Sequence, residues 1–483
     1  MVLGTTSGAG KSWLATALCR WYARQGLKVA PFKAQNMSNN ARVVEALGRE
    51  GEIGSAQYYQ ALAACAKPDV RMNPVLLKPE RDTHSQVVLM GQVDQELTHT
   101  PWRGRSEKVW PTIAAALDAL RQEFDVIVIE GAGSPAEINL MANDIVNMRV
   151  ARHSQAQCLM ICDIDRGGAF AHLYGTWALL EESDRALIRG FVLNKFRGDP
   201  LLLAPAPEQL RELTGIETVA VLPMWREHGL PQEDGVFDDS KHTHSEFSRT
   251  VYVLSYPQMS NLDEFEVFQR IPGVRLVWAR SLEDLRGIKL TDWMFLPGSK
   301  LTSNDLLWLR RQGLAKSVID HAHQGGRVLG ICGGLQMLGQ ILEDPHGIDG
   351  GALGLGLLSL KTRFELTKTV RSCEPQFNQV KGAWSELSYL QFKGFEIHHG
   401  NTTYCEDSTE SEYHTHEIIE GLAWQNSTGN VLGLYVHGLF ENANVIHRLF
   451  GHEHSSLDQV FDHLADFLEK HMPISVLKGL IEE

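Results

Sequence analysis

The first twelve residues, "MVLGTTSGAGKS" (1–12), decide the fold of the amino-terminal half. A short apolar run leads into glycines, a lysine and a serine: Gly4, Gly8, Gly10, Lys11 and Ser12. Glycines let backbone amides curl around phosphate oxygens, and the helix that follows adds its positive end. The lysine would neutralise phosphate charge, and the serine would place a hydroxyl on Mg²⁺. Five residues, not four, separate the first and third glycines, so a helix-capping turn is the alternative interpretation.

Apolar runs of strand length recur along the chain and alternate with amphipathic helical patterns. In the first half they are residues 28–33, 125–130, 157–165, 189–195 and 219–223. A second series lies at residues 250–257, 274–279, 292–298, 326–332 and 430–438. Strands separated by helices are typical of parallel sheets that are covered on both faces. We therefore predict an α/β protein whose amino-terminal parallel sheet carries the phosphate loop and whose second α/β domain follows it.

A polar stretch with little periodicity separates the two series. At 483 residues the chain is too long for one ordinary core. We place a first domain at residues 1–225, a linker at 226–249, a second domain at 250–445 and a helical tail at 446–483. The tail spaces its apolar residues on one helical face, which we interpret as a packing surface.

The composition indicates a globular, acidic protein. Hydrophobic residues make up 43% of the chain, charged residues 22%, and the formal net charge is −14. No block of Lys and Arg stands out, which argues against nucleic-acid binding. We find no apolar run that could span a bilayer and expect no secretory leader. Seven scattered cysteines fit neither a metal site nor a disulfide framework, and they favour a reducing cytoplasm.

Two charged residues end predicted strands in the first half. Glu130 ends "DVIVIE" (125–130), and Lys33 ends "KVAPFK" (28–33). Ligand sites of parallel sheets lie beyond the carboxyl ends of the strands, so both side chains are expected beside the phosphates. Mg²⁺ needs carboxylates as well as a hydroxyl, and an amine can meet a transferring phosphoryl group. We predict Glu130 as a metal ligand and Lys33 as a phosphate-binding residue.

The second half holds a cysteine among glycines, "GRVLGICGG" (326–334). The pattern predicts a strand, a tight turn at Cys332 and a helix, which is the cysteine counterpart of a nucleophile elbow. A nucleophilic thiol needs a base, and "LYVHGLFEN" (434–442) supplies His437 at the end of another strand. Gly298 follows a third strand and offers a backbone N–H for an oxyanion hole. A buried cysteine is usually only a small apolar residue, but the flanking glycines favour the catalytic interpretation.

Motifs from both halves together resemble one family. They are "GTTSGAGKS", "APFKAQNMSNN", "EGEIGSAQ", "VIEGAGSPAEINL", "DIDRGGAFA", "VLNKFRGD", "LPGSK", "GICGGLQMLG", "GFEIHHGNT" and "YVHGLFEN". In this order they are similar to the cobyric acid synthases, the glutamine-hydrolysing family of cobalamin biosynthesis. "PFKAQNMSNN" and "SPAEINL" are particularly specific to that family.

The resemblance implies an ATP-dependent amidoligase domain similar to dethiobiotin synthetase, followed by a class I glutamine amidotransferase domain. By that similarity the phosphate and Mg²⁺ roles fall to Gly8, Gly10, Lys11, Ser12, Lys33, Glu52 and Glu130, with Ser12, Glu52 and Glu130 on the metal. Asn194 matches a position that contacts adenine, while Cys332 and His437 match the nucleophile and its histidine. The implied small-molecule partners are ATP, L-glutamine and adenosylcobyrinic acid a,c-diamide. The oligomeric state stays open, a homo-oligomer included.

Two features depart from the expected patterns. Most class I amidotransferases carry a Glu two residues after the histidine, where this chain has Leu439. The family that it resembles lacks this Glu too, which leaves a Cys–His dyad, or His437 oriented by a backbone carbonyl or by Glu441. The phosphate loop also begins almost at Met1, so the first strand is very short, whereas the family usually has several residues more.

The predicted reaction joins the two halves. ATP phosphorylates the b, d, e and g carboxylates of the a,c-diamide, because a carboxylate becomes a good electrophile only as an acyl phosphate. Cys332 attacks the amide of glutamine, and the released ammonia attacks the acyl phosphate. The nearest alternative is a cobyrinic acid a,c-diamide synthase-like amidoligase, against which "PFKAQNMSNN" argues. A partitioning-type ATPase switch would need a second lysine in the phosphate loop and would leave Cys332 and His437 unexplained.

Overall fold

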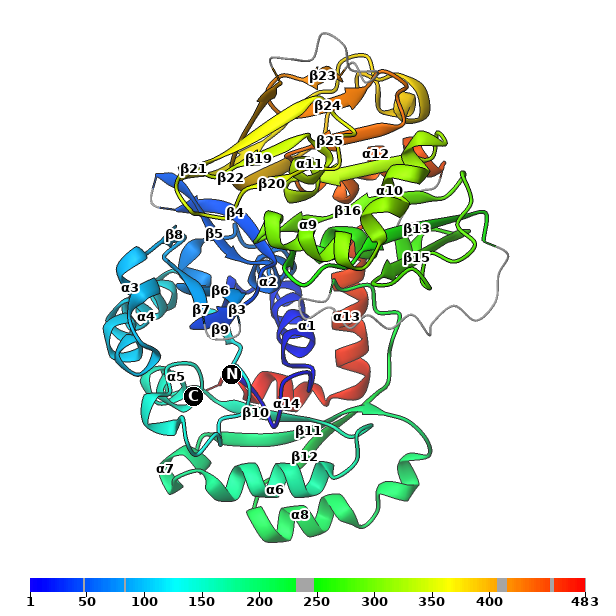
Figure 1. Ribbon diagram of the computed structural model, residues 1–483. Coiled ribbons are helices and arrows are strands. Elements are labelled where there is room, and N and C mark those ends of the chain that lie inside the picture. The colour runs from blue at the N-terminus through cyan, green and yellow to red at the C-terminus, as the bar shows by residue number, and fades with distance from the viewer. Residues whose placement is uncertain (47, 82–83, 232–246, 406–414, 452–455, 483) are drawn as a thin grey trace.

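The computed structural model describes residues 1–46, 48–81, 84–231, 247–405, 415–451 and 456–482. The amino-terminal elements fill the lower and left part of Figure 1, and the sheets of the second half lie above them. The carboxy-terminal helix returns from the upper part to the lower one. The predicted α/β architecture with two sheet systems is confirmed.

The first half is built on a parallel sheet with the order β1-β10-β11-β12. Its strands are β1 (Val2–Gly4), β10 (Cys158–Asp163), β11 (Ile188–Phe196) and β12 (Thr218–Pro223). A second parallel pair, β2 (Val29–Phe32) and β9 (Val126–Ile129), joins β1 through a bridge between Val2 and Glu130. Every residue of β10 is buried, as expected for a strand covered on both faces. The five strands predicted in this half are confirmed.

Helices surround this sheet and connect its strands. They are α1 (Lys11–Arg24), α2 (Ser55–Ala63), α3 (Gln95–His99), α4 (Trp102–Glu123), α5 (Met148–Ser154), α6 (Ala169–Leu179), α7 (Glu182–Arg185) and α8 (Ala206–Thr214). The alternation of strand and helix brings the carboxyl ends of β1, β2, β9, β10 and β11 to one edge of the sheet. That edge carries the phosphate loop.

A group of strands that the sequence analysis did not predict connects the two halves. One sheet has the order β3-β6-β7-β8, with β3 (Gln35–Met37), β6 (Val75–Arg81), β7 (His84–Leu89) and β8 (Gln92–Val93). An antiparallel hairpin consists of β4 (Ala41–Ala46) and β5 (Arg49–Gly54). In Figure 1 this hairpin reaches toward the long strands of the second half. The amide of Ser372 there donates a hydrogen bond to Glu50 at 2.7 Å.

The second half is built on a sheet with the order β15-β13-β16-β18-β25-β24-β23. Its strands are β13 (Arg249–Leu254), β15 (Val274–Ala279), β16 (Trp293–Leu296), β18 (Arg327–Ile331), β23 (Thr415–Ile419), β24 (Ala423–Asn426) and β25 (Val431–Leu434). The five predicted strands form its parallel part, and β24 and β23 add an antiparallel edge. The flanking helices are α9 (Thr302–Arg311), α10 (Leu314–His323), α11 (Gly333–Leu338) and α12 (Ala443–Phe450).

A smaller set of strands completes this half, and the two longest of them contact the amino-terminal hairpin. Two short strands, β14 (Met259–Ser260) and β17 (Gly298–Ser299), pair antiparallel. A separate sheet has the order β20-β19-β21-β22, with β19 (Ile341–Glu343), β20 (Ala352–Leu353), β21 (Leu360–Cys373) and β22 (Gly394–Tyr404).

The tail packs against the first half of the chain. Helix α13 (Leu457–His471) lies along α1 in Figure 1, and α14 (Ile474–Gly479) follows it. Phe461 and Leu464 are buried in the same apolar cluster as Leu14, so the predicted packing face is confirmed. An ion pair between Arg20 and Asp462 at 2.8 Å flanks this contact. Much of the predicted linker, residues 232–246, lies outside the described residues.

None of the helices in the described ranges combines the length and apolar character needed to cross a membrane.

Candidate active sites

Cys332 occupies a strained turn between β18 and α11. Its backbone angles are φ 53° and ψ −107°, which a non-glycine residue adopts only where the surroundings enforce them. Gly334 has no room for a side chain, because a Cβ there would lie 1.9 Å from the carbonyl oxygen of Leu296. The helix therefore packs directly on the neighbouring strand and presents the thiol at the carboxyl edge of the sheet. The predicted nucleophile-elbow geometry is present.

His437 and Glu264 complete the surroundings of the thiol. The imidazole follows β25, is 1% exposed and interacts with the thiol of Cys332, which donates to the carbonyl of Ile397 at 3.6 Å. Its Nδ1 lies 2.9 Å from Oε1 of Glu264, and the other carboxylate oxygen accepts a hydrogen bond from the amide of Gly438 at 3.0 Å. Burial lowers the pKa of His437, but the charge of Glu264 and the thiol raise it to about 10. Cys332, His437 and Glu264 thus form a series in which each side chain interacts with the next.

The structure corrects the expectation for the group that orients His437. The carboxylate comes from Glu264 on the 3-10 helix η5 (Leu262–Arg270), not from the chain segment after the histidine. Glu441 points elsewhere and forms an ion pair with Arg42 at 2.5 Å. Leu439 is fully buried. The bare dyad and the Glu441 alternative therefore do not describe this arrangement. Sequence reasoning missed Glu264 because no spacing rule links "LDEFE" to "YVHG".

Gly298 lies against the imidazole of His437. A Cβ at this position would be 2.9 Å from Cε1 of His437 and 2.5 Å from the hydroxyl of Ser260. Its neighbour Ser299 packs against Gly333, which directly follows the thiol. The structure thus brings Gly298 to the site, and its oxyanion role stays a prediction.

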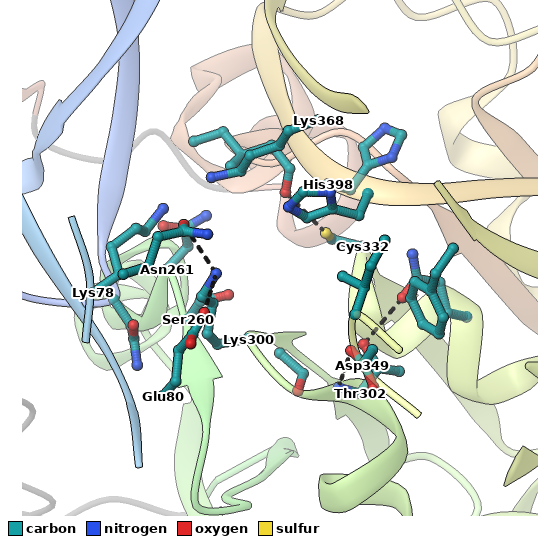
Figure 2. Close-up of a pocket in the computed structure, with 18 residues that line it drawn as sticks. Lys78, Glu80, Ser260, Asn261, Lys300, Thr302, Cys332, Asp349, Lys368 and His398 are labelled. Carbon is teal, nitrogen blue, oxygen red and sulfur yellow. Dashed lines mark hydrogen bonds and ion pairs between the residues drawn. The ribbon is translucent and has the colours of Figure 1, made fainter. Parts of the chain in front are cut away.

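The thiol opens into a cavity that residues from both halves line (Figure 2). Its volume is about 90 Å³. In Figure 2 the sulfur of Cys332 and the ring of His398 lie on one side, and Lys78 of the amino-terminal half lies on the other. His398 is held by Glu396 at 3.1 Å and stacks on Tyr435. The cavity connects the thiol directly to the domain interface.

A buried carboxylate between lysines forms part of the wall of this interface. Glu52 accepts from Lys78 at 2.5 Å and from Lys368, so both its oxygens are engaged. Burial lowers the pKa of Lys368 to about 7 in spite of Glu52. Glu52 was expected on the metal, but the structure places it between the halves and gives it no contact with Ser12 or Glu130. A carboxylate held by two buried lysines, one from each half, joins the halves at their interface.

The phosphate loop has the predicted form. Gly10 has φ 106°, which favours glycine, and a Cβ there would lie 2.1 Å from the amide nitrogen of Asn194. That amide donates to the carbonyl of Ala9 at 2.9 Å, so Asn194 supports the loop from β11. Lys11 folds back over Gly4 and donates to the carbonyls of Thr6 and Gly133 at 3.0 and 3.1 Å.

Glu130 accepts hydrogen bonds from two other residues predicted for this site, Ser12 and Lys33. Its Oε1 accepts from the hydroxyl of Ser12 at 2.8 Å and from Lys33 at 2.9 Å. Its Oε2 accepts from Gln60 at 2.6 Å, a contact that the sequence analysis did not predict. Burial opposes ionisation of Glu130, but Lys33, Gln60 and Ser12 lower its pKa. The group remains a carboxylate at neutral pH.

The donor atoms around Glu130 fit a small, hard cation. A hydroxyl, a carboxylate and an amide carbonyl are oxygen ligands of the kind that Mg²⁺ takes. The carbonyl oxygen of Gln60 is buried and, within the described ranges, has no hydrogen-bond partner. No set of three or more His, Cys, Asp or Glu side chains that could hold a metal occurs in the described parts of the chain. A cation here would therefore need phosphate oxygens or water as further ligands.

Comparisons with known proteins match the two halves of the chain separately. A family model described as CobQ/CobB/MinD/ParA nucleotide binding domain matches residues 1–228, and one described as CobB/CobQ-like glutamine amidotransferase domain matches residues 250–445. Cobyric acid synthase of Variovorax paradoxus (strain S110) is 68% identical over 482 residues, covering 100% of this chain and 98% of the relative. Those of Acidovorax ebreus (strain TPSY) and Leptothrix cholodnii (strain ATCC 51168 / LMG 8142 / SP-6) are 63% and 56% identical. They cover 99% and 100% of this chain, and 98% and 96% of the relatives.

Proposed function

The chain belongs to the cobyric acid synthase family, and we propose that it amidates the b, d, e and g carboxylates of adenosylcobyrinic acid a,c-diamide, using ATP and L-glutamine. It is a glutamine-hydrolysing carbon–nitrogen ligase of cobalamin biosynthesis. The observation that carries the detailed proposal is the Cys332–His437–Glu264 series, which opens into a cavity shared with the nucleotide-binding half.

The thiol site releases ammonia from glutamine. Cys332 attacks the side-chain amide carbon as a thiolate, and the protonated His437 gives its proton to the departing nitrogen. Ammonia leaves, and a glutamyl thioester remains on sulfur. His437 then takes a proton from water, which attacks the thioester and releases glutamate. Glu264 fixes the imidazole orientation and stabilises its charged form, and the amide of Gly298 is proposed for the oxyanion.

The phosphate site activates the carboxylate that will receive the nitrogen. The amides of Gly8 and Gly10, together with Lys11, are proposed to bind the ATP phosphates. Asn194 is proposed near adenine by the family resemblance, in addition to supporting the loop. Lys33 meets the transferring phosphoryl group. Transfer to a peripheral carboxylate gives an acyl phosphate, which ammonia attacks with loss of inorganic phosphate.

Mg²⁺ is the ion that this donor set favours. Ser12, Glu130 and Gln60 would supply its protein oxygens, while Glu52 takes no part. When bound, the ion would neutralise charge on the phosphates. Gln60 donates to Glu130 in the structure, so its amide would have to turn its oxygen toward the ion.

One measurement of product mass tests the proposal. The full chain is incubated with adenosylcobyrinic acid a,c-diamide, ATP, Mg²⁺ and glutamine labelled with ¹⁵N in its side-chain amide. We expect a product with labelled amides at b, d, e and g and none without ATP. In a parallel incubation with unsubstituted cobyrinic acid, amidation at a and c only would instead support the a,c-diamide synthase alternative. ATP hydrolysis with no amide product would overturn both.

A further inference from the structure

The segment that follows Lys33 connects the two proposed active sites. Lys33 contacts Glu130 at the phosphate site. The chain then forms β3, which pairs with β6. It reaches the surface of the second half at Asn40 and Arg42, which are 3% and 2% exposed. This stretch contains "PFKAQNMSNN". Nothing in the proposed chemistry so far requires two buried polar residues at its end.

Asn40 and the residue after it hold one turn of the amidotransferase half. The side-chain oxygen of Asn40 accepts a hydrogen bond from the amide of Leu262 at 2.9 Å. In return, the amide of Ala41 donates to the side-chain oxygen of Asn261 at 2.9 Å. Asn261 has φ 55° and begins η5, the helix that carries Glu264. The amino-terminal half therefore fixes the start of the element that supplies the carboxylate.

Arg42 joins that element to the turn that carries the histidine. Its guanidinium pairs with Asp263, the neighbour of Glu264, and with Glu441 on the 3-10 helix η8 (Leu439–Glu441) at 2.5 Å. The helix η8 begins directly after Gly438, whose amide binds Glu264. A single cation from the first half thus bridges the two segments that meet at the His437–Glu264 contact.

A third contact of Arg42 supports the imidazole through a ring. The guanidinium lies 5.0 Å from the centre of the Phe395 ring. Phe395 stacks on His437 with ring centres 5.4 Å apart, and the two residues exchange backbone hydrogen bonds. Arg42 therefore contacts neighbours of both His437 and Glu264, and it does not line the cavity at the thiol.

The charges explain why the site needs this cation. Asp263, Glu264 and Glu441 bring three carboxylates close to one histidine, and His437 can pair with only one of them. Removing Arg42 would leave Asp263, which is 4% exposed, without its cationic partner beside Glu264. The segment at 261–264 would then move, and Glu264 with it.

We propose that Asn40 and Arg42 are positioning residues of the glutaminase site that the synthetase half supplies. Resting on the proposed function, this inference makes glutamine hydrolysis depend on the first half even before any nucleotide binds. Both residues would act through Glu264, and neither of them lines the cavity beside Cys332.

The test measures glutamine hydrolysis and ammonia-dependent amidation in full-length variants. Asn40→Ala and Arg42→Met should each lower kcat for glutamine hydrolysis by about 10- to 100-fold, because small misplacements of a catalytic group are costly. KM for glutamine should change less than kcat, because only Asn261 of the displaced segment lines the cavity, and ammonia-dependent synthesis should remain. Arg42→Lys should recover part of kcat. The matched control is Glu50→Ala, which removes an interface contact away from this turn and should leave hydrolysis unchanged.

A double-mutant cycle separates positioning from general destabilisation. In a Glu264→Gln background, Asn40→Ala should cost less than about 2-fold, since the group through which it acts is already lost. Unchanged kcat in both single variants would overturn the inference, as would equal loss of the hydrolysis and ammonia activities. An undiminished cost in the Glu264→Gln background would overturn it too. The proposed function itself fails on different evidence, namely a wild-type chain that forms no amide from either nitrogen donor.

Discussion

The two proposed active sites of this chain differ in the contacts that their side chains make before any substrate binds. At the thiol site, the histidine is already held between Cys332 and Glu264, and the contacts are those that hydrolysis needs. At the phosphate site, the charged groups satisfy one another: Glu130 binds Lys33 and Ser12, and Lys11 binds backbone carbonyls. The first site is arranged for its reaction before glutamine arrives. The second must exchange internal contacts for those of the nucleotide and, in the proposed function, of Mg²⁺.

The free-energy cost of breaking these contacts is also smaller at the phosphate loop than at the thiol site. A lysine that donates to backbone carbonyls gives up charged hydrogen bonds worth about 1.5–3 kcal/mol each, which phosphate contacts replace. Leaving one member of a buried ion pair without its partner costs about 3–5 kcal/mol. Substitutions at the thiol site should therefore act on chemistry and stability together, whereas those at the phosphate loop should act on catalysis with the fold retained.

The largest effect should come from Cys332→Ala. Glutamine-dependent amidation should fall to background, because no other group can form the thioester. Amidation from a high concentration of ammonium chloride should continue, since the phosphate site accepts free ammonia. Product mass with each nitrogen donor measures both. Equal loss with the two donors in a variant of unchanged melting temperature would contradict the two-site comparison.

Lys11→Ala should have the opposite effect: it should abolish the synthetase reaction and spare glutamine hydrolysis. Amidation should fall by a factor on the order of 10³ with either donor, because the lysine stabilises charge on the transferring phosphoryl group. Basal glutamine hydrolysis should persist, since Cys332 and His437 are untouched. Glutamate release and amide formation are followed in the same reaction. Near-normal amidation would mean that the glycine-rich loop only caps α1.

Glu264→Gln should lower kcat for glutamine hydrolysis by about 10²- to 10⁴-fold, the range expected when a histidine loses its orienting carboxylate. KM for glutamine should change little, because Glu264 does not border the cavity. Without its charge, burial would lower the pKa of His437 from about 10. The alkaline limb of the rate profile should therefore move to lower pH. A profile that keeps its alkaline limb would argue against the His437–Glu264 pair.

The same variant gives a stability test with a defined sign. A histidine whose pKa rises on folding contributes stability below its ordinary pKa of 6.5, and this contribution is lost as the pH rises through about 10. The difference in free energy of unfolding between wild type and Glu264→Gln should be largest below pH 6.5 and should shrink toward pH 10. Denaturant melts at several pH values measure it.

The sequence predicted what depends on local pattern. Strands appear where apolar runs end at Lys33, Glu130 and Cys332, because a buried parallel strand leaves a continuous apolar signal. The turn at Cys332 was predicted from its glycines, and the structure shows that they are needed for close packing.

What could not be predicted depends on contacts between distant segments. Glu264 meets His437 across 173 positions of sequence, and Glu52 meets Lys368 across 316. A charged residue in a short amphipathic stretch looks the same whether it faces solvent or a partner. For that reason the sequence did not show that Glu52 contacts Lys78 and Lys368, or that Glu264 and not Glu441 contacts His437.

Glu52→Gln should sharpen the contrast between interface and metal site. We expect the Mg²⁺ dependence of amidation to stay as in wild type, since Glu52 binds Lys78 and Lys368. Stability should fall by about 3 kcal/mol, because two largely buried lysines lose their shared carboxylate. Glu130→Gln is the matched variant and should raise the Mg²⁺ concentration needed for half-maximal rate. A comparable rise in this Mg²⁺ concentration for Glu52→Gln would show that Glu52 is a metal ligand after all.

The smallest change should follow Glu441→Gln. The side chain is 28% exposed and pairs with Arg42, not with His437, and a glutamine oxygen can still accept from the guanidinium. Glutamine hydrolysis should therefore drop by no more than about 3-fold, the scale of a partly exposed ion pair. Leu439→Glu, which restores the usual position of the third residue, should bring no gain. Leu439 is fully buried, and a carboxylate there would lack a partner. A loss in Glu441→Gln as large as in Glu264→Gln, or a gain in Leu439→Glu, would show that the histidine takes its orientation from its own segment.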